Sequence, residues 1–401
     1  MLQGNRIIMR LVGILSTITL VEVLMSSRSI LEHFETLPDP RISRCRLHPL
    51  HTILTIILCA MLCGIEDIEG MQEWAEDKWE WLRERCDLTN GIPSHDTLGR
   101  TLARLDPKTF ADCFRAWVQD LKEPLEQEII AVDGKTLRHS FDTKRGQSAI
   151  HMVSALATKS RLILGQIKVA DKSNEITAVP ELLKMLDLAG CIVTTDAMSC
   201  QKAIARQIVE QGGDYLLALK GNHPHLEEDV AALFTHQEGL RVDGIPLHKA
   251  ETLERNRTRL ETRTATAIAL SDLHGTWSDI EEEWSGLCSL LRIHRRREYQ
   301  GKVSEETCYF LSSLPADAPN LLGVSRAHWG IENSVHWVLD VAFLEDQCRT
   351  RKDHAPANLA TVRHIALNLL RTEETVTLGI RNKRLKASRS DKYLECLLKK
   401  L

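Results

Sequence analysis

The sequence lacks several features that would assign it to a common class of protein. Its 11 cysteines form no Cys-x-x-Cys pair and show no Cys/His spacing of the zinc-finger kind. This pattern argues against a disulfide framework and is typical of a reduced cytoplasmic protein. Internal repeats and low-complexity blocks are also missing. The formal net charge is −4, so no overall positive field indicates a nucleic-acid partner.

Near the N-terminus, no hydrophobic run is long enough to span a membrane. The apolar run Leu11–Val21 follows Arg6 and Arg10, but it is too short to cross a bilayer. No small-x-small cleavage site follows it, which argues against a signal peptide. We therefore interpret residues 1–28 as an N-terminal extension, with a mis-assigned start codon as one explanation, and expect a cytoplasmic location.

The 401 residues are enough for two or three domains with a substantial core. Residues 29–127 have helical patterns, of which the apolar stretch Leu47–Ile65 predicts one buried helix that ends at Gly64. Leu98, Leu102 and Leu105 recur at helical spacing after a turn. This region has 11 basic and 18 acidic residues, so both a DNA-reading helix-turn-helix and a purely structural helical domain stay open.

From residue 128 onward, short apolar strands alternate with helices, which predicts an α/β fold with a mixed sheet flanked by helices. Strands are expected at Glu128–Val132, Ala149–Ala157, Leu162–Ala170, Cys191–Thr195 and Tyr215–Leu219. Helices are expected at Val179–Leu188, Gln201–Gln211 and Leu226–Phe234. The predicted division is a catalytic core over 128–239, a β-rich insertion over 240–315, the last core helices over 316–371 and a basic tail over 372–401. Within the insertion, strands are expected at Thr262–Leu270, Ser289–His294 and Thr307–Ser312.

Two aspartates each follow a buried apolar strand. Asp133 ends Ile129-Ile-Ala-Val-Asp-Gly, and Asp196 ends Cys191-Ile-Val-Thr-Thr-Asp. Side chains at the ends of adjacent strands meet in the crevice beyond a sheet, where ligands bind in open α/β folds. Two neighbouring carboxylates repel each other unless a cation lies between them, and Mg²⁺ prefers such oxygen ligands. The alternative is that each Asp opens a turn or caps the following helix.

A third acid lies on a predicted helix over Ala318–Asp346. His328, Glu332, His336 and Asp340 recur every four residues, so they share one helical face beside an apolar stripe. This face could complete a two-metal site, but a solvated polar face and a zinc site that uses both histidines and the glutamate are alternatives.

At these residues the sequence resembles the bacterial insertion-sequence DDE transposases, in the branch that contains the H-repeat-associated proteins of Rhs elements. The likeness rests on a set of motifs spread along the chain, namely Leu37-Pro-Asp-Pro-Arg41, Gly91-Ile-Pro-Ser-His-Asp-Thr97, Ala131-Val-Asp-Gly-Lys-Thr136, Thr194-Thr-Asp-Ala197, Leu217-Ala-Leu-Lys-Gly-Asn222, His328-Trp-Gly-Ile-Glu-Asn-Ser-Val-His-Trp-Val-Leu-Asp-Val341 with Glu345-Asp346, and Asn358–Leu370. Agreement in so many separate places is more specific than any one of these motifs.

The resemblance implies an RNase H-like catalytic core with a β-rich insertion and an N-terminal helical domain. It also implies that Asp133, Asp196 and Glu332 hold two Mg²⁺ or Mn²⁺ ions for in-line displacement at DNA phosphates. The expected activity is strand cleavage and strand transfer at the terminal inverted repeats of the element. Double-stranded DNA is the expected partner, with a homodimer that holds two element ends. The alternative is an inactive or domesticated transposase-derived protein that only binds DNA.

One motif departs from the family pattern, and it concerns phosphate binding. Related families carry Tyr, Arg and Lys around the glutamate, where this sequence has Ser325, His328 and Leu339. Other residues are therefore the candidates for DNA contact, by their charge or their place in the expected crevice. They are Lys135, Lys220, Asn222, Arg292, Arg295, Arg296, Arg297, Arg326, His328 and His336.

Overall fold

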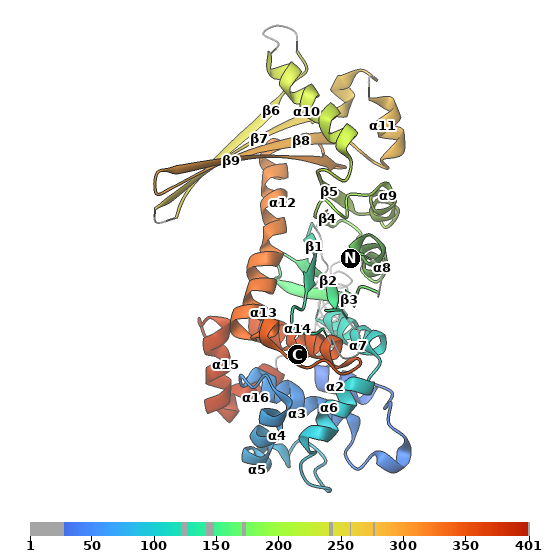
Figure 1. The fold of residues 1–401 in the computed structure, drawn as a ribbon, viewed down its shortest axis with the longest axis vertical. Coiled ribbons are helices and arrows are strands. Elements are labelled where there is room, and N and C mark those ends of the chain that lie inside the picture. Colours follow the sequence, from blue (N-terminus) through green and yellow to red (C-terminus); the bar gives the residue numbers. More distant parts are fainter. Residues whose placement is uncertain are drawn as a thin grey trace, which may run out of the picture. The chain divides into compact units, whose positions relative to one another are not determined.

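The computed structural model describes residues 28–121, 127–141, 148–170, 174–239, 244–256, 258–275 and 277–399. The predicted extension over 1–28 therefore lies outside the described residues except for its last one. The chain divides into two compact units. We call Pro124–Arg349 the sheet unit, and Met1–Glu123 together with Thr350–Leu401 the helical unit (Figure 1).

The sheet unit is built on nine described strands that form one sheet in the order β3-β2-β1-β4-β5-β9-β8-β7-β6. The two central pairs, β1 with β4 and β4 with β5, are parallel, and all other neighbours are antiparallel. The strands are β1 Ile129–Thr136, β2 His151–Ala157, β3 Leu162–Lys168, β4 Ile192–Thr195, β5 Asp214–Leu219, β6 His248–Asn256, β7 Arg259–Ala269, β8 Ser289–Tyr299 and β9 Lys302–Ser312. The predicted mixed sheet flanked by helices is thus confirmed.

Helices cover both faces of strands β1 to β5 in the sheet unit. Figure 1 shows α8 (Glu175–Lys184) and α9 (Lys202–Glu210) on the side opposite to α12 (Ala318–Ile331). Helix α12 buries Leu321, Leu322 and Val324 against Leu216 of β5 and Leu291 of β8, so it spans the junction of core and insertion. The remaining elements are α10 Pro224–Gly239, the short helices Leu270–Leu273 and α11 Ser278–Glu283, a π-helical turn Glu332–His336, α13 Trp337–Ala342 and the 3₁₀ turn Glu345–Gln347.

The β-rich insertion continues the core sheet. β9 pairs with β5 through Leu217 and Leu311, and β8, β7 and β6 follow outward. The predicted strands over 262–270, 289–294 and 307–312 correspond to β7, β8 and β9. β6 was not predicted because its sequence, His248-Lys-Ala-Glu-Thr-Leu-Glu-Arg-Asn256, has no apolar alternation. β6 lies at the edge of the sheet and, among the described strands, pairs only with β7. Polar residues suit an edge strand, because its other side faces solvent.

The helical unit is organised around α14 (Ala355–Thr372), whose residues from Ala355 to Leu370 are all buried. The buried Asn358 amide donates to the backbone carbonyls of Leu102 (2.7 Å) and Leu105 (2.8 Å) at the end of α6. The other elements are α2 Ile30–Glu35, the 3₁₀ turn Ser43–Cys45, α3 Leu50–Leu62, α4 Ile68–Asp77, α5 Trp79–Leu82, α6 His95–Arg104, α7 Pro107–Asp120, α15 Ile380–Arg389 and α16 Asp391–Lys399. Helix α14 thus groups with the N-terminal helices, whereas we expected it among the last core helices.

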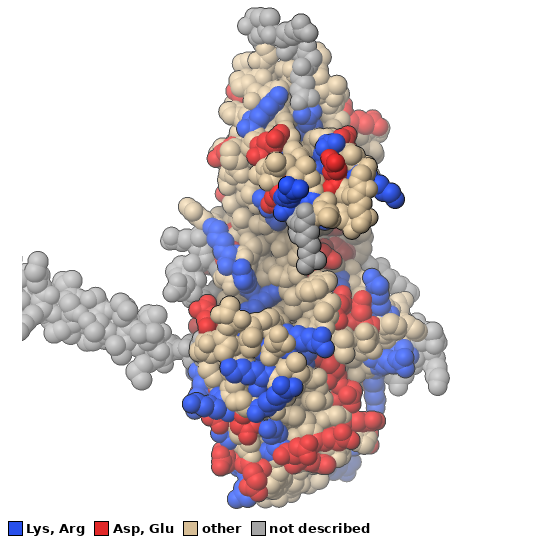
Figure 2. Space-filling model, turned by 90° about the vertical axis from the view of Figure 1, so that its left-hand side faces the viewer, with Lys and Arg blue, Asp and Glu red and all other residues tan. Residues whose placement is uncertain are grey.

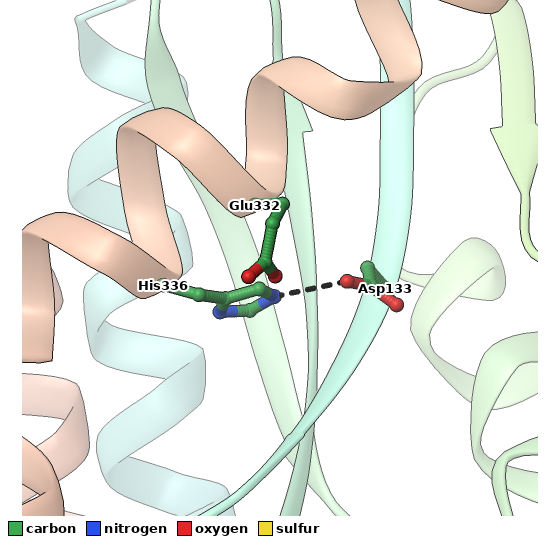
Figure 3. A group of neighbouring side chains, drawn as sticks. All are labelled: Asp133, Glu332 and His336. Carbon is green, nitrogen blue, oxygen red and sulfur yellow. Dashed lines mark ion pairs between the residues drawn. The ribbon is translucent and has the colours of Figure 1, made fainter. Parts of the chain in front are cut away.

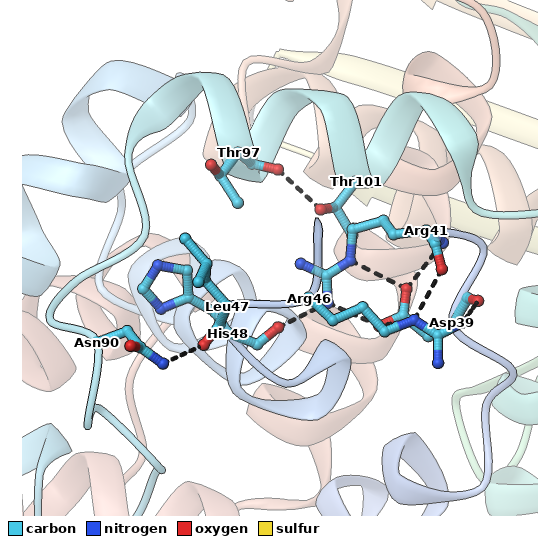
Figure 4. A network of polar contacts seen from close by, with 8 residues as sticks. All are labelled: Asp39, Arg41, Arg46, Leu47, His48, Asn90, Thr97 and Thr101. Carbon is cyan, nitrogen blue, oxygen red and sulfur yellow. Dashed lines mark hydrogen bonds and ion pairs between the residues drawn. The ribbon is translucent and has the colours of Figure 1, made fainter. Parts of the chain in front are cut away.

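The Leu37-Pro-Asp-Pro-Arg41 motif folds a loop of the helical unit onto itself (Figure 4). The Arg41 guanidinium donates to both carboxylate oxygens of Asp39 (2.9 and 2.7 Å) and to the His48 carbonyl (2.6 Å). Arg46 donates to the carbonyls of Arg41 (2.7 Å) and Asp39 (3.0 Å). Arg41 is only 6% exposed, so in this structure the motif organises the loop between α2 and α3.

The segment predicted as a basic tail forms two packed helices, α15 and α16. Arg384 of α15 is buried, and its guanidinium donates to the Met61 carbonyl (3.0 and 2.6 Å) and pairs with Glu66. Arg363 of α14 lies 3.5 Å from the same Glu66 carboxylate. Burial of Glu66 raises the pKa of its carboxyl group, and Arg363 and Arg384 oppose that shift. This buried group of charges joins α15 to α14 and to the end of α3.

We expect Arg384→Ala to lower the free energy of unfolding by about 3–5 kcal/mol, because it leaves Glu66 buried with less compensation. Arg381→Ala on the same helix is the matched control, since Arg381 is exposed, and its effect should stay within about 0.5 kcal/mol. Urea unfolding followed by circular dichroism measures both. Equal stabilities of the two variants would contradict this account of α15.

Candidate active site

Two predicted carboxylates lie side by side at the centre of the sheet. β1 and β4 are parallel neighbours, and Val132 is paired with Thr195 in their register. Asp133 is the next residue of β1 and Asp196 directly follows β4, so their backbones are adjacent. The prediction that Asp133 ends its strand is wrong, because β1 continues to Thr136 through antiparallel pairing with β2. The Asp196 carboxylate accepts a hydrogen bond from the Ser199 amide (3.2 Å), which orients it at the start of the turn.

The third predicted acid, Glu332, reaches Asp133 from the helix that lies across β1. Asp133, Glu332 and His336 each place one ligand atom within 4.8 Å of the others (Figure 3). His336 is only 5% exposed, and its Nε2 lies 3.2 Å from Asp133 Oδ2. Neither His336 ring nitrogen forms a hydrogen bond with the described part of the chain. The structure therefore brings together two of the three predicted acids and one predicted histidine.

Glu332 and His336 bound a π-helical turn between α12 and α13. Just before and within this turn, the Asn333 amide donates to the Trp329 carbonyl (2.9 Å) and the Ser334 hydroxyl to the Gly330 carbonyl. Such side-chain bonds to preceding carbonyls bend a helix, and single π turns are frequent at functional sites. The wider turn changes the facing of side chains four residues apart, so the predicted α-helical stripe is interrupted here.

His328 lies behind the two aspartates. Its Nδ1 is 3.1 Å from the Thr194 hydroxyl of β4. Burial lowers the pKa of His328, and the charges of Asp133 and Asp196 only partly oppose that shift. Burial thus disfavours the charged imidazole, and the ring is placed to form a hydrogen bond with Thr194.

Lys135 follows the first aspartate by two residues, but its ammonium group points at carboxylates of the same unit. It donates to Glu345 Oε2 (2.9 Å) and Asp340 Oδ1 (2.5 Å). Burial by itself would lower the pKa of Lys135, yet Glu345 and Asp340 outweigh it, so the pKa is raised. Glu345 is almost fully buried. In this structure Lys135 ties the segment after the π turn to β1.

The other predicted DNA-contacting residues lie in two places. Lys220 and Asn222 follow β5, where Lys220 is exposed and the Asn222 amide donates to the Cys200 carbonyl (3.2 Å). Asn222 also lines a pocket with Lys202, His223 and Trp284. Neither belongs to the group formed by Asp133, Glu332 and His336.

The arginines of the insertion are largely matched by acids on neighbouring strands. Arg295 pairs with Glu306, Arg296 with Glu305 (3.5 Å) and Glu298 (3.4 Å), and Arg297 with Glu261 (3.3 Å). Arg292 donates to the Thr266 hydroxyl (3.3 Å) and lies over the Phe234 ring, while Arg326 pairs with Glu254. Figure 2 shows basic and acidic side chains interspersed on one face of the molecule. Most of these arginines therefore have acidic partners in this structure.

Sequence reasoning missed two residues next to the aspartates. Glu175, the first residue of α8, pairs with His151 at the start of β2, with 2.6 Å between Oε1 and Nε2. The charges of Asp196 and Asp133 both act on Glu175. Glu175 lies just before the helix that we predicted, and no motif marks it. The only signal was an acid in the crossover between β3 and β4.

The side chains present fit a divalent cation. Two carboxylates and a buried imidazole converge, and carboxylate oxygens are the preferred ligands of Mg²⁺ and Mn²⁺. The Nδ1 of His336 is buried without a hydrogen-bond partner among the described residues. Buried polar atoms usually have such a partner. A bound cation would also offset the repulsion between the acids.

A sheet in the order 3-2-1-4-5, with one acid within β1, a second directly after β4 and a third on a helix across β1, is the arrangement of an RNase H-like domain. Comparison with protein families agrees with this class. Residues 124–369 match the model described as "Transposase DDE domain", and residues 31–118 match the model described as "DDE_Tnp_1-associated". The chain belongs to the DDE transposase family.

Relatives similar over nearly the full length come from Escherichia coli. The chain is 38% identical over 379 residues to the "H repeat-associated putative transposase YhhI" of strain K12, covering 93% of this chain and 98% of the relative. It is 37% identical over 380 residues to the "Putative transposase YncI" of strain O157:H7, covering 93% and 95%. A short relative named "Inactive transposase YbfQ" is 32% identical over 80 residues, 20% of this chain and 95% of its own.

One finding bears on membranes. Within the described ranges, no helix combines the length and the apolar character that are needed to cross a bilayer.

We expect Lys135→Ala to destabilise the protein by about 3 kcal/mol or more, because it leaves the buried Glu345 carboxylate without its cation. Lys220→Ala is the control, since Lys220 is exposed, and it should change the free energy of unfolding by less than about 0.5 kcal/mol. Chemical denaturation distinguishes them. If Lys135→Ala is as stable as the wild type and only DNA affinity falls, Lys135 contacts DNA as the sequence suggested.

Proposed function

We propose that this protein is an active transposase that cleaves DNA strands at the terminal inverted repeats of its element and transfers them to target DNA. The observation that carries the proposal is the convergence of Glu332, from the helix across β1, on Asp133, whose neighbour in the sheet is Asp196. These three acids are the proposed catalytic and metal-binding residues. Double-stranded DNA of the element ends and of the target is the proposed substrate.

The proposed cofactor is a pair of Mg²⁺ or Mn²⁺ ions. Asp133, Asp196 and Glu332 would hold them, and His336 lies within reach as a nitrogen ligand. Bound divalent ions lower the pKa of water or of a 3′-hydroxyl and stabilise the leaving oxygen in displacement at a phosphate.

The surrounding residues keep the acids in place. Lys135 fixes the segment after the π turn to the strand that carries Asp133, so Glu332 and Asp133 are held by one ion-paired assembly. Buried His328 is held by the Thr194 hydroxyl of β4, which lies 3.1 Å from its Nδ1. Acids held in this way need little rearrangement to bind cations.

DNA contact is proposed for the basic residues of the insertion and for the residues near the site. Arg295, Arg296, Arg297 and Arg326 would exchange their present carboxylate partners for phosphates. Arg292, Lys220, Asn222, His328 and His336 complete the proposed set. A homodimer would hold two element ends together during catalysis, and a cytoplasmic location is proposed with it.

We expect Asp133→Asn to reduce nicking of element-end DNA in Mg²⁺ by more than about 100-fold, because it removes a ligand and its charge while keeping the shape of the side chain. Asp279→Asn, at an exposed acid of α11, is the matched control and should cleave at the wild-type rate. Cleavage of a labelled duplex that carries the inverted repeat measures both.

Equal cleavage by Asp133→Asn would contradict the assignment of the acids. A wild-type protein that binds the duplex but leaves it intact in Mn²⁺ would favour the alternative, a DNA-binding protein derived from a transposase.

A further inference from the structure

The His151–Glu175 pair lies directly on the strand that carries Asp133. His151 Nε2 is 2.6 Å from Glu175 Oε1, and His151 Nδ1 is 2.8 Å from the Thr136 hydroxyl. A Cβ atom on Gly134 would lie 2.2 Å from the same Glu175 oxygen and 2.4 Å from His151 Nε2. Only glycine leaves room for the pair here, so β1 is shaped at the residue after Asp133 to receive it.

The Glu175 carboxylate is largely buried. Its side chain is 13% exposed, although an acid that only complements a helix N-terminus gains as much at the surface. Burial raises the pKa of Glu175, Asp196 raises it further, His151 opposes this, and Asp133 adds to the rise. Glu175 therefore shares one electrostatic environment with both aspartates.

The nearby basic groups already have partners. Lys135 is paired with Asp340 and Glu345, His151 with Glu175 (2.6 Å) and His336 with Asp133 (3.2 Å). His336 is only 5% exposed, and the ring nitrogen that faces Asp133, Nε2, forms no hydrogen bond within the described ranges although it lies 3.2 Å from Asp133 Oδ2 (Figure 3). A positively charged ligand would satisfy both observations.

We propose that Glu175 is a fourth carboxylate of the metal site and that His151 holds it there. The inference rests on the metal site of the proposed function and extends it by one ligand. Four carboxylates carry a charge of −4, which equals the charge of two divalent ions with opposite sign, whereas three would leave one positive charge. Thr136, His151 and Glu175 form a hydrogen-bonded chain that orients the carboxylate, as partners of metal ligands commonly do.

Mn²⁺ binding to the full chain tests this without relying on activity. We expect Glu175→Gln to weaken Mn²⁺ binding by at least about tenfold, measured from the electron paramagnetic resonance signal of free Mn²⁺. Glu181→Gln is the matched control, since Glu181 lies on the same helix and pairs with Lys184 in solvent (2.6 Å). It should bind Mn²⁺ like the wild type.

A second variant moves the Glu175–His151 pair without changing either residue. Gly134→Ala should also weaken Mn²⁺ binding, because the new methyl group displaces the Glu175–His151 pair. Gly165→Ala on β3 is its control, since the nearest atom to an added Cβ there is 3.5 Å away, an ordinary contact. Circular dichroism verifies that all variants are folded.

Asp133→Asn, measured in the same assay, separates the two proposals. If Asp133→Asn weakens Mn²⁺ binding and folded Glu175→Gln does not, the fourth ligand is wrong and the proposed metal site stands. Loss of cleavage in Glu175→Gln with normal Mn²⁺ affinity overturns the ligand role as well. If Asp133→Asn also binds Mn²⁺ normally, the metal site itself is wrong.

Discussion

Mutual repulsion between carboxylates is the constraint on which the catalytic region depends. Asp133 and Asp196 are neighbours in the sheet register, Glu332 reaches Asp133 from a helix, and Glu175 lies close enough for both aspartates to act on its charge. Such a group of like charges is unfavourable by itself. Contacts elsewhere in the fold hold the acids together. A bound cation then relieves their repulsion, which favours cation binding.

Those contacts come from elements that are far apart in the sequence. α12 is anchored in the apolar core beside β5 and β8, which carries the π turn across β1. Beyond the turn, Lys135 ties Asp340 and Glu345 back to the same strand. Glu332 is therefore fixed on both sides, and the π turn between the two anchors sets the direction of its side chain relative to His336. Rigid support of this kind is what a metal site requires.

Much of the core could be predicted from the sequence because its signals are local. The apolar run before Asp133 and the one before Asp196 predict buried strands, and both are found as β1 and β4. The same reasoning did not predict Glu175 as a site residue. Glu175 lies in the first turn of α8, before the periodic apolar residues of that helix on which the helix prediction rested. Gly134 gave a hint of close approach, but only the structure identifies what approaches it.

The C-terminal helices were missed for a different reason. Lys383 and Arg384 are charged, and charged residues are rarely buried without partners, so the sequence indicated only a basic tail. Their partners, Glu373, the Leu370 carbonyl and Glu66, lie outside α15, and Glu66 is more than 300 residues away in the chain. Likewise the arginines of the insertion seemed a basic cluster until β7 and β9 placed acids beside them.

Thermal unfolding at pH 8 with and without Mn²⁺ tests the central claim most directly. The claim is that the fold holds mutually repelling carboxylates together to bind a cation. The account predicts that saturating Mn²⁺ raises the melting temperature of the wild type by about 5–10 °C. It also predicts that Asp133→Asn, which relieves repulsion, melts no lower than the wild type without metal and gains less from Mn²⁺. Equal melting curves for the wild type with and without Mn²⁺ would contradict the account.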